Sequence, residues 1–221
     1  MILALETATA TGSVALYDKN LVGESTLSIQ RTHSERLMPA VVAILRDAGV
    51  EPVQLTAIAV SLGPGSFTGL RIGVMTAKTL AWSLNVPLVG IPTLDAMAWN
   101  LRYGRGLLCP VLNCRRGDVY GALYLADGAS EPQRQTDYLA LPLTQLQSEA
   151  ESFPGPQYWL GDLTPESGAG IVVTGELALP KAAAVAQLAQ RRLSQGKTED
   201  PASVVPLYVR GSAAKPRRAP H

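Results

Sequence analysis

The chain has 221 residues, of which 47% are hydrophobic and 17% charged, and its 19 Lys and Arg residues nearly balance its 18 Asp and Glu residues. A net charge of +1 argues against the strongly basic face by which a protein grips nucleic acid on its own. The length accommodates one large domain or two small ones, with a sizeable buried core.

Composition and the first residues also bear on the compartment. No apolar run approaches the length of a membrane span. The stretch Met1 to Glu6 has no basic residue and reaches a carboxylate too early for a signal peptide, so we expect a cytosolic protein. Cys109 and Cys114 are five residues apart in a predicted strand, which points them to opposite faces. We expect buried small side chains there rather than a redox or metal pair.

The first part of the chain predicts three strands with short connections, followed by a helix. The strands are Ile2 to Glu6, Ser13 to Tyr17 and Leu21 to Ile29. The helix is predicted over His33 to Ala48, because Thr32 and Glu35 form a capping-box pattern and Gly49 follows. Pro39 lies inside this helix and is expected to kink it.

Apolar residues cover an arc about 200° wide on this helix, whereas packing on one core needs only about 100°. The surplus predicts a second contact, either with another part of the chain or with another protein, and we favour another protein. The candidate partner-interface residues on this helix are Leu37, Met38, Val41 and Leu45.

A glycine-rich loop, Gly63 to Gly73 (GPGSFTGLRIG), follows a predicted buried strand over Leu55 to Leu62. Ser66 is a favourable N-cap for a helix predicted to run to Leu84, so backbone N–H groups at its start could hold an anion. Neither standard nucleotide signature fits, because no Lys follows a glycine and Thr68 replaces the third glycine of the dinucleotide fingerprint.

We therefore interpret Gly63, Gly65 and Ser66 as a structural loop. In the helix that follows, Gly69, Gly73 and Ala77 are spaced four residues apart and share one face. Each helical glycine costs about 1 kcal/mol relative to alanine, which predicts close packing against a neighbouring backbone. The spacing leaves open whether that neighbour is in this chain, and these three residues complete the candidate partner interface.

The remaining elements repeat the opening pattern after a strand at Leu88 to Ile91. Strands are predicted at Leu107 to Asn113 and Val119 to Leu125, where Ala122-Leu123-Tyr124 repeats Ala15-Leu16-Tyr17. The later elements are helices over Pro142 to Glu149 and Pro180 to Leu193, extended segments over Ile171 to Thr174 and Val204 to Tyr208, and a turn-rich surface connection over Phe153 to Gly170.

This order of elements predicts an α/β fold with two tandem halves and mixed sheets. The boundary is placed between Arg102 and Gly106, which gives an N-terminal half at residues 1–104 and a C-terminal half at 105–210. Residues 211–221 are expected to be a disordered tail, whose Lys215, Arg217 and Arg218 are solvated charges.

Five segments carry a resemblance to a known family. They are Ile2 to Thr9, Arg31 to Pro39, Gly63 to Gly73, Arg115 to Tyr120 and Pro206 to Arg210. With them the chain resembles the TsaB (YeaZ) family of tRNA threonylcarbamoyladenosine biosynthesis proteins, within the superfamily of actin-like ATPases, sugar kinases and the Hsp70 ATPase domain. The resemblance is close over the first 125 residues and implies two RNase H-like halves.

The resemblance implies a noncatalytic partner of the related subunit TsaD, which transfers a threonylcarbamoyl group to the adenosine beside the anticodon in tRNAs that read ANN codons. The two helices that begin near His33 and Ser66 would form much of the contact. A TsaE-like ATPase in the larger assembly, only indirect contact with tRNA, and a homodimer through the same surface when TsaD is absent are also implied. No catalytic residue, metal or cofactor is expected.

Two departures fit loss of catalysis. The catalytic relative binds its metal through two histidines four residues apart, whereas this chain has only His33 and His221 and carries Leu37 four residues after His33. An actin-like ATPase places an Asp in its first strand-turn, where this chain has Glu6. Members of the family usually show Asp there, and most also show Asp at the place of Asn113.

Two alternatives remain. An autonomous ATPase or small-molecule kinase would use the Gly63 to Gly73 loop for phosphate and Glu6 for the metal, although the loop lacks a cation for the phosphate charge. A serine hydrolase would use Ser66 or Thr68 as its nucleophile and His33 as the one plausible base. The Gly-x-Ser-x-Gly elbow that would support it is absent.

Overall fold

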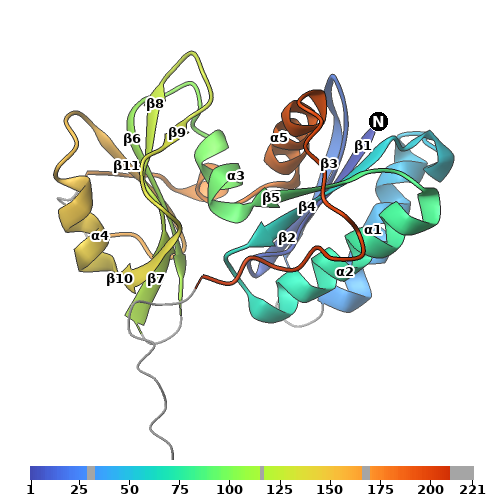
Figure 1. The fold of residues 1–221 in the computed structure, drawn as a ribbon, viewed down its shortest axis with the longest axis horizontal. Helices are drawn as coiled ribbons and strands as arrows, with labels where there is room; N and C mark the ends of the chain where they lie inside the picture. The colour runs from blue at the N-terminus through green and yellow to red at the C-terminus, as the bar shows by residue number, and fades with distance from the viewer. Residues whose placement is uncertain (29–32, 115–116, 166–169, 210–221) are drawn as a thin grey trace, which may run out of the picture.

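The computed structural model describes residues 1–28, 33–114, 117–165 and 170–209, and it contains two mixed sheets side by side (Figure 1). The first sheet has the order β3-β2-β1-β4-β5, in which β1, β2 and β3 are antiparallel and β1, β4 and β5 are parallel. Its strands are β1 (Ile2–Glu6), β2 (Thr11–Asp18), β3 (Asn20–Ser28), β4 (Ala57–Gly63) and β5 (Leu88–Pro92).

The second sheet repeats this topology, in the order β10-β7-β6-β11-β12, again with one antiparallel side and one parallel side. Its strands are β6 (Arg105–Asn113), β7 (Asp118–Gly121), β10 (Leu139–Pro142), β11 (Gln157–Gly161) and β12 (Ile171–Val172), with the hairpin of β8 (Tyr124–Asp127) and β9 (Gln133–Arg134) added at β6. The repeat confirms the predicted class of two α/β halves with mixed sheets.

Helices cover both faces of the first sheet. The helices α1 (His33–Asp47) and α2 (Phe67–Leu84) pack on one face, and α5 (Ala182–Ser194) packs on the other. The alternation of β1 explains the two layers, because Leu3 and Leu5 join the α1/α2 core whereas Ile2 and Ala4 join the α5 core.

The shorter helices complete the architecture. The helix α3 (Thr93–Trp99) lies between the sheets and contributes to the cores of both, and α4 (Leu143–Ala150) covers the outer face of the second sheet. The 3₁₀ helices η1 (Pro52–Gln54) and η3 (Gly175–Ala178) precede β4 and α5, respectively. None of the helices in the described residues is long and apolar enough to cross a membrane.

The helix α5 is held to the first sheet by its own N-terminus. The backbone N–H groups of Ala182 and Ala183 donate to the Ser13 hydroxyl and the Glu24 carboxylate, each at 2.9 Å. These side chains from β2 and β3 satisfy donors that a helix start leaves unpaired. The expected C-terminal half at residues 105–210 therefore does not pack as one body, because its last helix belongs to the first sheet.

Several predicted elements differ in detail. The predicted strand over Val119 to Leu125 is split into β7 and β8, because the facing residue Pro110 has no N–H to donate to the ladder. The helix α3 was not predicted, and β11 lies inside the segment taken as a surface connection. The stretch Val204 to Tyr208 forms no regular strand. The capping residue Thr32 lies outside the described residues.

We expect a fragment of residues 1–104, the predicted N-terminal half, to lack a cooperative thermal transition. It would expose the apolar face formed by Ile2, Ala4, Val89 and Ile91, which α5 covers in the whole chain. Circular dichroism during heating, compared with the full chain, measures this. A sharp transition in the fragment would mean that α5 is dispensable for the first sheet.

Candidate functional site

The glycine loop is closed onto the turn between β1 and β2. The Ser66 N–H donates to the carbonyl of Ala8 at 2.7 Å, and a Cβ added to Gly65 would lie under 3.0 Å from that same oxygen. At Gly63, with φ of +113°, an added Cβ would lie 2.8 Å from the carbonyl of Leu207. Glycine at both positions therefore permits backbone contact on two sides of the loop.

The small-residue face of α2 packs against the same turn. A Cβ on Gly69 would lie under 3.0 Å from the Thr7 carbonyl, and one on Gly73 would lie equally close to the Thr7 hydroxyl. Ala77 continues this face and is fully buried. The neighbour that the spacing left undefined is therefore the β1–β2 turn of this chain.

Glu6, at the end of β1, is sealed beneath the turn with no exposed surface. Its carboxyl group accepts hydrogen bonds from the Ser61 hydroxyl and from the Ala8 N–H, the second at 2.5 Å. Burial raises the pKa of Glu6 from 4.5 to about 7, because the charged form loses its hydration there, and the hydrogen bonds offset part of that shift.

This geometry limits what chemistry the loop can support. The buried carboxyl group of Glu6 cannot reach a metal ion or water in an open cleft, and the Ser66 hydroxyl caps α2 by accepting from the Gly69 N–H at 3.3 Å. In the part of the chain that the structure describes, no three His, Cys, Asp or Glu side chains are grouped as a metal would require. The side chain of His33, the base of the hydrolase alternative, lies outside that part.

The predicted interface residues divide into two groups. Leu37, Val41 and Leu45 of α1 belong to the core between this helix and the sheet. Gly69, Gly73 and Ala77 lie on the face of α2 that packs on the β1–β2 turn, so all six residues are buried within this chain. Met38 is the seventh and is 40% exposed. Any protein that docks on these helices would therefore meet Met38 and its exposed neighbours rather than the other six residues.

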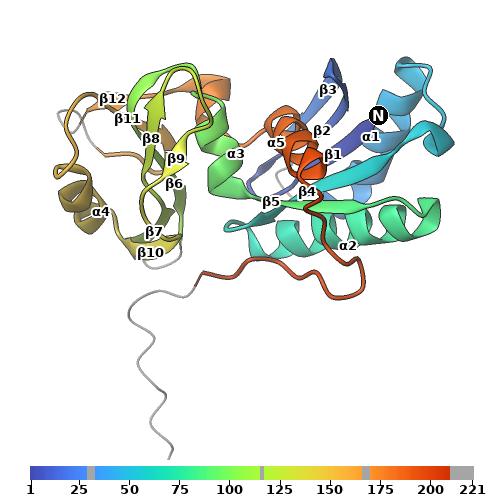
Figure 2. The same cartoon turned by 45° about the horizontal axis from the view of Figure 1, so that its top comes forward.

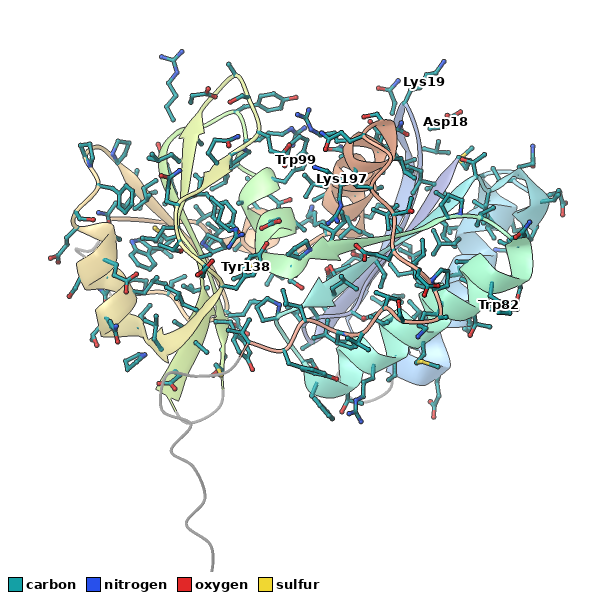
Figure 3. The ribbon with its side chains drawn as sticks, viewed as in Figure 1. Asp18, Lys19, Trp82, Trp99, Tyr138 and Lys197 are labelled. Atoms are coloured by element: carbon teal, nitrogen blue, oxygen red, sulfur yellow. The ribbon has the colours of Figure 1, made fainter. Side chains whose placement is uncertain are left out.

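Those neighbours are exposed apolar side chains on α1 and α2 that the sequence analysis did not place in the interface. We call Met38 and Val42 of α1 together with Phe67, Met75 and Trp82 of α2 the helical layer, and all five are exposed. Trp82 is 75% exposed and extends outward near the end of α2 (Figure 3). The spacing of Phe67 and Met75, opposite Gly69 on the helical wheel, was the signal available in the sequence.

The C-terminal segment extends this surface, since residues 202–208 run beside α2 (Figure 2). The Leu207 N–H donates to the Leu62 carbonyl at 2.7 Å, which anchors the segment to β4. At the start of α2 the Arg71 guanidinium lies 3.9 Å from the Phe67 ring centre and donates to the Tyr208 hydroxyl at 3.2 Å. The Phe67 and Tyr208 rings also contact each other, with their centres 5.5 Å apart. Arginine and aromatic side chains of this kind are enriched among the residues that dominate the binding energy of protein interfaces.

The close packing of α2 on the β1–β2 turn predicts that replacing Gly69 by alanine lowers the free energy of unfolding. Gly69→Ala should destabilise the fold by about 1–3 kcal/mol because the new methyl group overlaps the Thr7 carbonyl, although helix propensity alone would stabilise it by about 1 kcal/mol. Urea unfolding measures the difference. The exposed position Ser83 serves as control, and Ser83→Ala should change stability by less than about 0.5 kcal/mol. A more stable Gly69→Ala variant would contradict the close packing.

Glu6 predicts a pH dependence of stability. The unfolded chain releases this proton near pH 4.5 and the folded chain near pH 7, so the folded state loses stability as the pH rises between these values. Glu6→Gln mimics the neutral acid. Its stability relative to the natural chain should therefore rise by about 3 kcal/mol from pH 4.5 to pH 7 and then level off. Urea unfolding of both chains between pH 4.5 and pH 7 measures this stability difference, and Glu151→Gln at an exposed position is the control. A stability difference between Glu6→Gln and the natural chain that does not change with pH would contradict the raised pKa.

Comparison with known proteins gives consistent matches. The family model of TsaD, described as tRNA N6-adenosine threonylcarbamoyltransferase, matches residues 20–139. The tRNA threonylcarbamoyladenosine biosynthesis protein TsaB of Escherichia coli (strain K12) is 33% identical over 224 residues, covering 96% of each chain. TsaB of Bacillus subtilis (strain 168) is 44% identical over 124 residues, which cover 56% of this chain and 54% of the relative.

Solved structures with a similar fold include a member of the same family. YeaZ from Pseudomonas aeruginosa has a TM-score of 0.81 at 26% identity, covering 94% of this chain and 99% of its own. The ROK hexokinase from Thermus thermophilus has a TM-score of 0.52 at 13% identity, covering 88% and 99%, and shows the shared fold alone. These likenesses confirm the predicted actin-like ATPase fold with two RNase H-like halves. Because a TsaB relative is matched over nearly its whole length and a YeaZ structure over the whole fold, the chain belongs to the TsaB/YeaZ family.

Proposed function

We propose that this protein is the noncatalytic partner of a TsaD-like subunit in the threonylcarbamoyl modification of tRNA, and that it docks through the helical layer. The exposure of Met38, Val42, Phe67, Met75 and Trp82 on two adjacent helices is the observation that carries the proposal. Exposed apolar side chains gathered on one layer are typical of an interaction surface. The relatives named for tRNA threonylcarbamoyladenosine biosynthesis supply the pathway.

The match to the TsaD family model supports the choice of partner. That model covers residues 20–139, which include both α1 and α2. A partner built on the same fold carries corresponding helices, so the two proteins can meet around an approximate two-fold axis, with α1 and α2 facing their counterparts. A second copy of this chain offers the same surface, and a homodimer is therefore expected when the partner is absent.

The closed state of the glycine loop supports a noncatalytic role. The loop packs on Ala8, the small face of α2 packs on Thr7, and Glu6 is sealed below them. Phosphoryl transfer needs groups that neutralise phosphate charge and hold a metal ion. A hollow of about 490 Å³ also lies between the sheets, and its charged lining residues, Lys181 and Glu176, pair with each other at 2.7 Å. The autonomous kinase is thus less well supported.

The rest of the assembly follows from the same proposal. A TsaE-like ATPase joins the complex, and the threonylcarbamoyl modification of tRNA takes place in the cytoplasm. The near balance of charge, 19 basic against 18 acidic residues, favours indirect contact with tRNA through the partner.

The test is size-exclusion chromatography with light scattering on the chain mixed with its cognate TsaD-like subunit. Val42→Glu should abolish the heterodimer, because it places a charge in the helical layer at an exposed position where folding is not at risk. Val53→Glu is the matched control, since Val53 is 84% exposed on η1, outside the helical layer. Heterodimer formation by Val42→Glu, or ATP turnover by the isolated chain, would overturn the proposal.

A further inference from the structure

A cavity of about 520 Å³ lies between the two halves and is lined by residues of α3, α5 and the β8–β9 hairpin. This volume is within the range of roughly 300–1,000 Å³ that small-molecule sites occupy. None of the five residues of the helical layer lines it. Trp99 of α3 and Lys197, in the chain that follows α5, both line this cavity (Figure 3). The cavity is therefore separate from the docking surface.

One wall of this cavity presents an oriented carboxylate. Oδ1 of Asp95 accepts hydrogen bonds from the Tyr124 hydroxyl at 2.6 Å and the Tyr138 hydroxyl at 2.9 Å. The other carboxylate oxygen has no hydrogen-bond partner among the residues that the structure describes, and Asp95 lines the cavity. Two tyrosines thus fix the direction of a carboxylate that keeps one oxygen free to accept from a hydroxyl or amino group.

Positive groups surround this acceptor. The cavity is lined by four cations, Arg134, Arg191, Arg192 and Lys197, against the two carboxyl groups of Asp95 and Glu131. Arg191 pairs with Glu131 across the cavity at 3.1 Å, and Arg192 pairs with Glu199 at 3.2 Å. The ammonium group of Lys197 has no ion pair within the described ranges. Its charge is free to attract an anion into the cavity.

We propose that this cavity binds a small anionic molecule that carries hydroxyl groups, as a sugar phosphate or a hydroxy acid does. The anionic end lies toward Lys197, where guanidinium and ammonium groups favour phosphate or carboxylate oxygens. A hydroxyl group donates to the free oxygen of Asp95. Tyr124, which also lines the cavity, and Tyr138 hold that carboxylate through their hydroxyl groups.

Isothermal titration calorimetry on the full chain tests this with two probes, ribose 5-phosphate and malate. At least one should bind with a Kd of about 1 mM or tighter, and the one that binds identifies the kind of anion. If ribose 5-phosphate binds, its two parts are tested separately: ribose lacks the anionic group, and orthophosphate lacks the sugar hydroxyl groups. Each of these fragments should bind about tenfold more weakly than ribose 5-phosphate; for a hydroxy acid, succinate in place of malate makes the same comparison.

Substitutions then locate the site. Asp95→Asn and Lys197→Gln should each weaken binding by about tenfold or more, and Lys197 is exposed without a side-chain partner, so its replacement leaves folding intact. Asp18→Asn and Lys19→Gln, at the exposed turn between β2 and β3, are the matched controls and should change the Kd by less than about twofold (Figure 3). No binding of either probe, equal binding by orthophosphate alone, or unchanged affinity in the cavity variants would overturn the proposal.

Discussion

The close approach of the glycine loop and α2 to the β1–β2 turn is the constraint on which the rest of the structure depends. Gly65 meets Ala8, while Gly69 and Gly73 meet Thr7, at distances that leave no room for a Cβ. In a kinase-like protein a loop at a helix N-terminus would surround phosphate. Here the turn of the same chain takes the adjoining space, and the buried carboxyl group of Glu6 lies beneath it.

This packing also decides how α1 and α2 are used. The small face of α2 lies against the turn, and three of the helix's larger apolar side chains, Phe67, Met75 and Trp82, are exposed on its other side. The wide apolar arc of α1 divides similarly into a buried side with Val41 and an exposed side with Val42. Both helices therefore serve the chain's own core on one face and leave apolar surface on the other, which is the arrangement that a subunit contact requires.

The C-terminal third connects the two halves. The helix α5 returns to the first sheet, where Ser13 and Glu24 satisfy its first N–H groups, and the segment to Tyr208 then passes along α2. Trp99 of α3 also donates to Gln187 of α5 at 2.5 Å. Contacts between distant parts of the sequence thus extend the surface of the helical layer and form the walls of the cavity between the halves.

The sequence by itself determined the fold class, the strands of the first half and the cap at Ser66, because these depend on periodicity and local backbone preference. Family membership was indicated by the resemblance of five segments, the glycine loop among them, to a known family. Tertiary structure alone decided which neighbour the small face of α2 meets, that six of seven expected interface residues are buried, and that α5 belongs to the first sheet. Periodicity shows that a face is apolar or small but not what covers it. Asp95 and Lys197 meet in one cavity only because α3, α5 and the β8–β9 hairpin converge, and no spacing along the chain encodes that convergence.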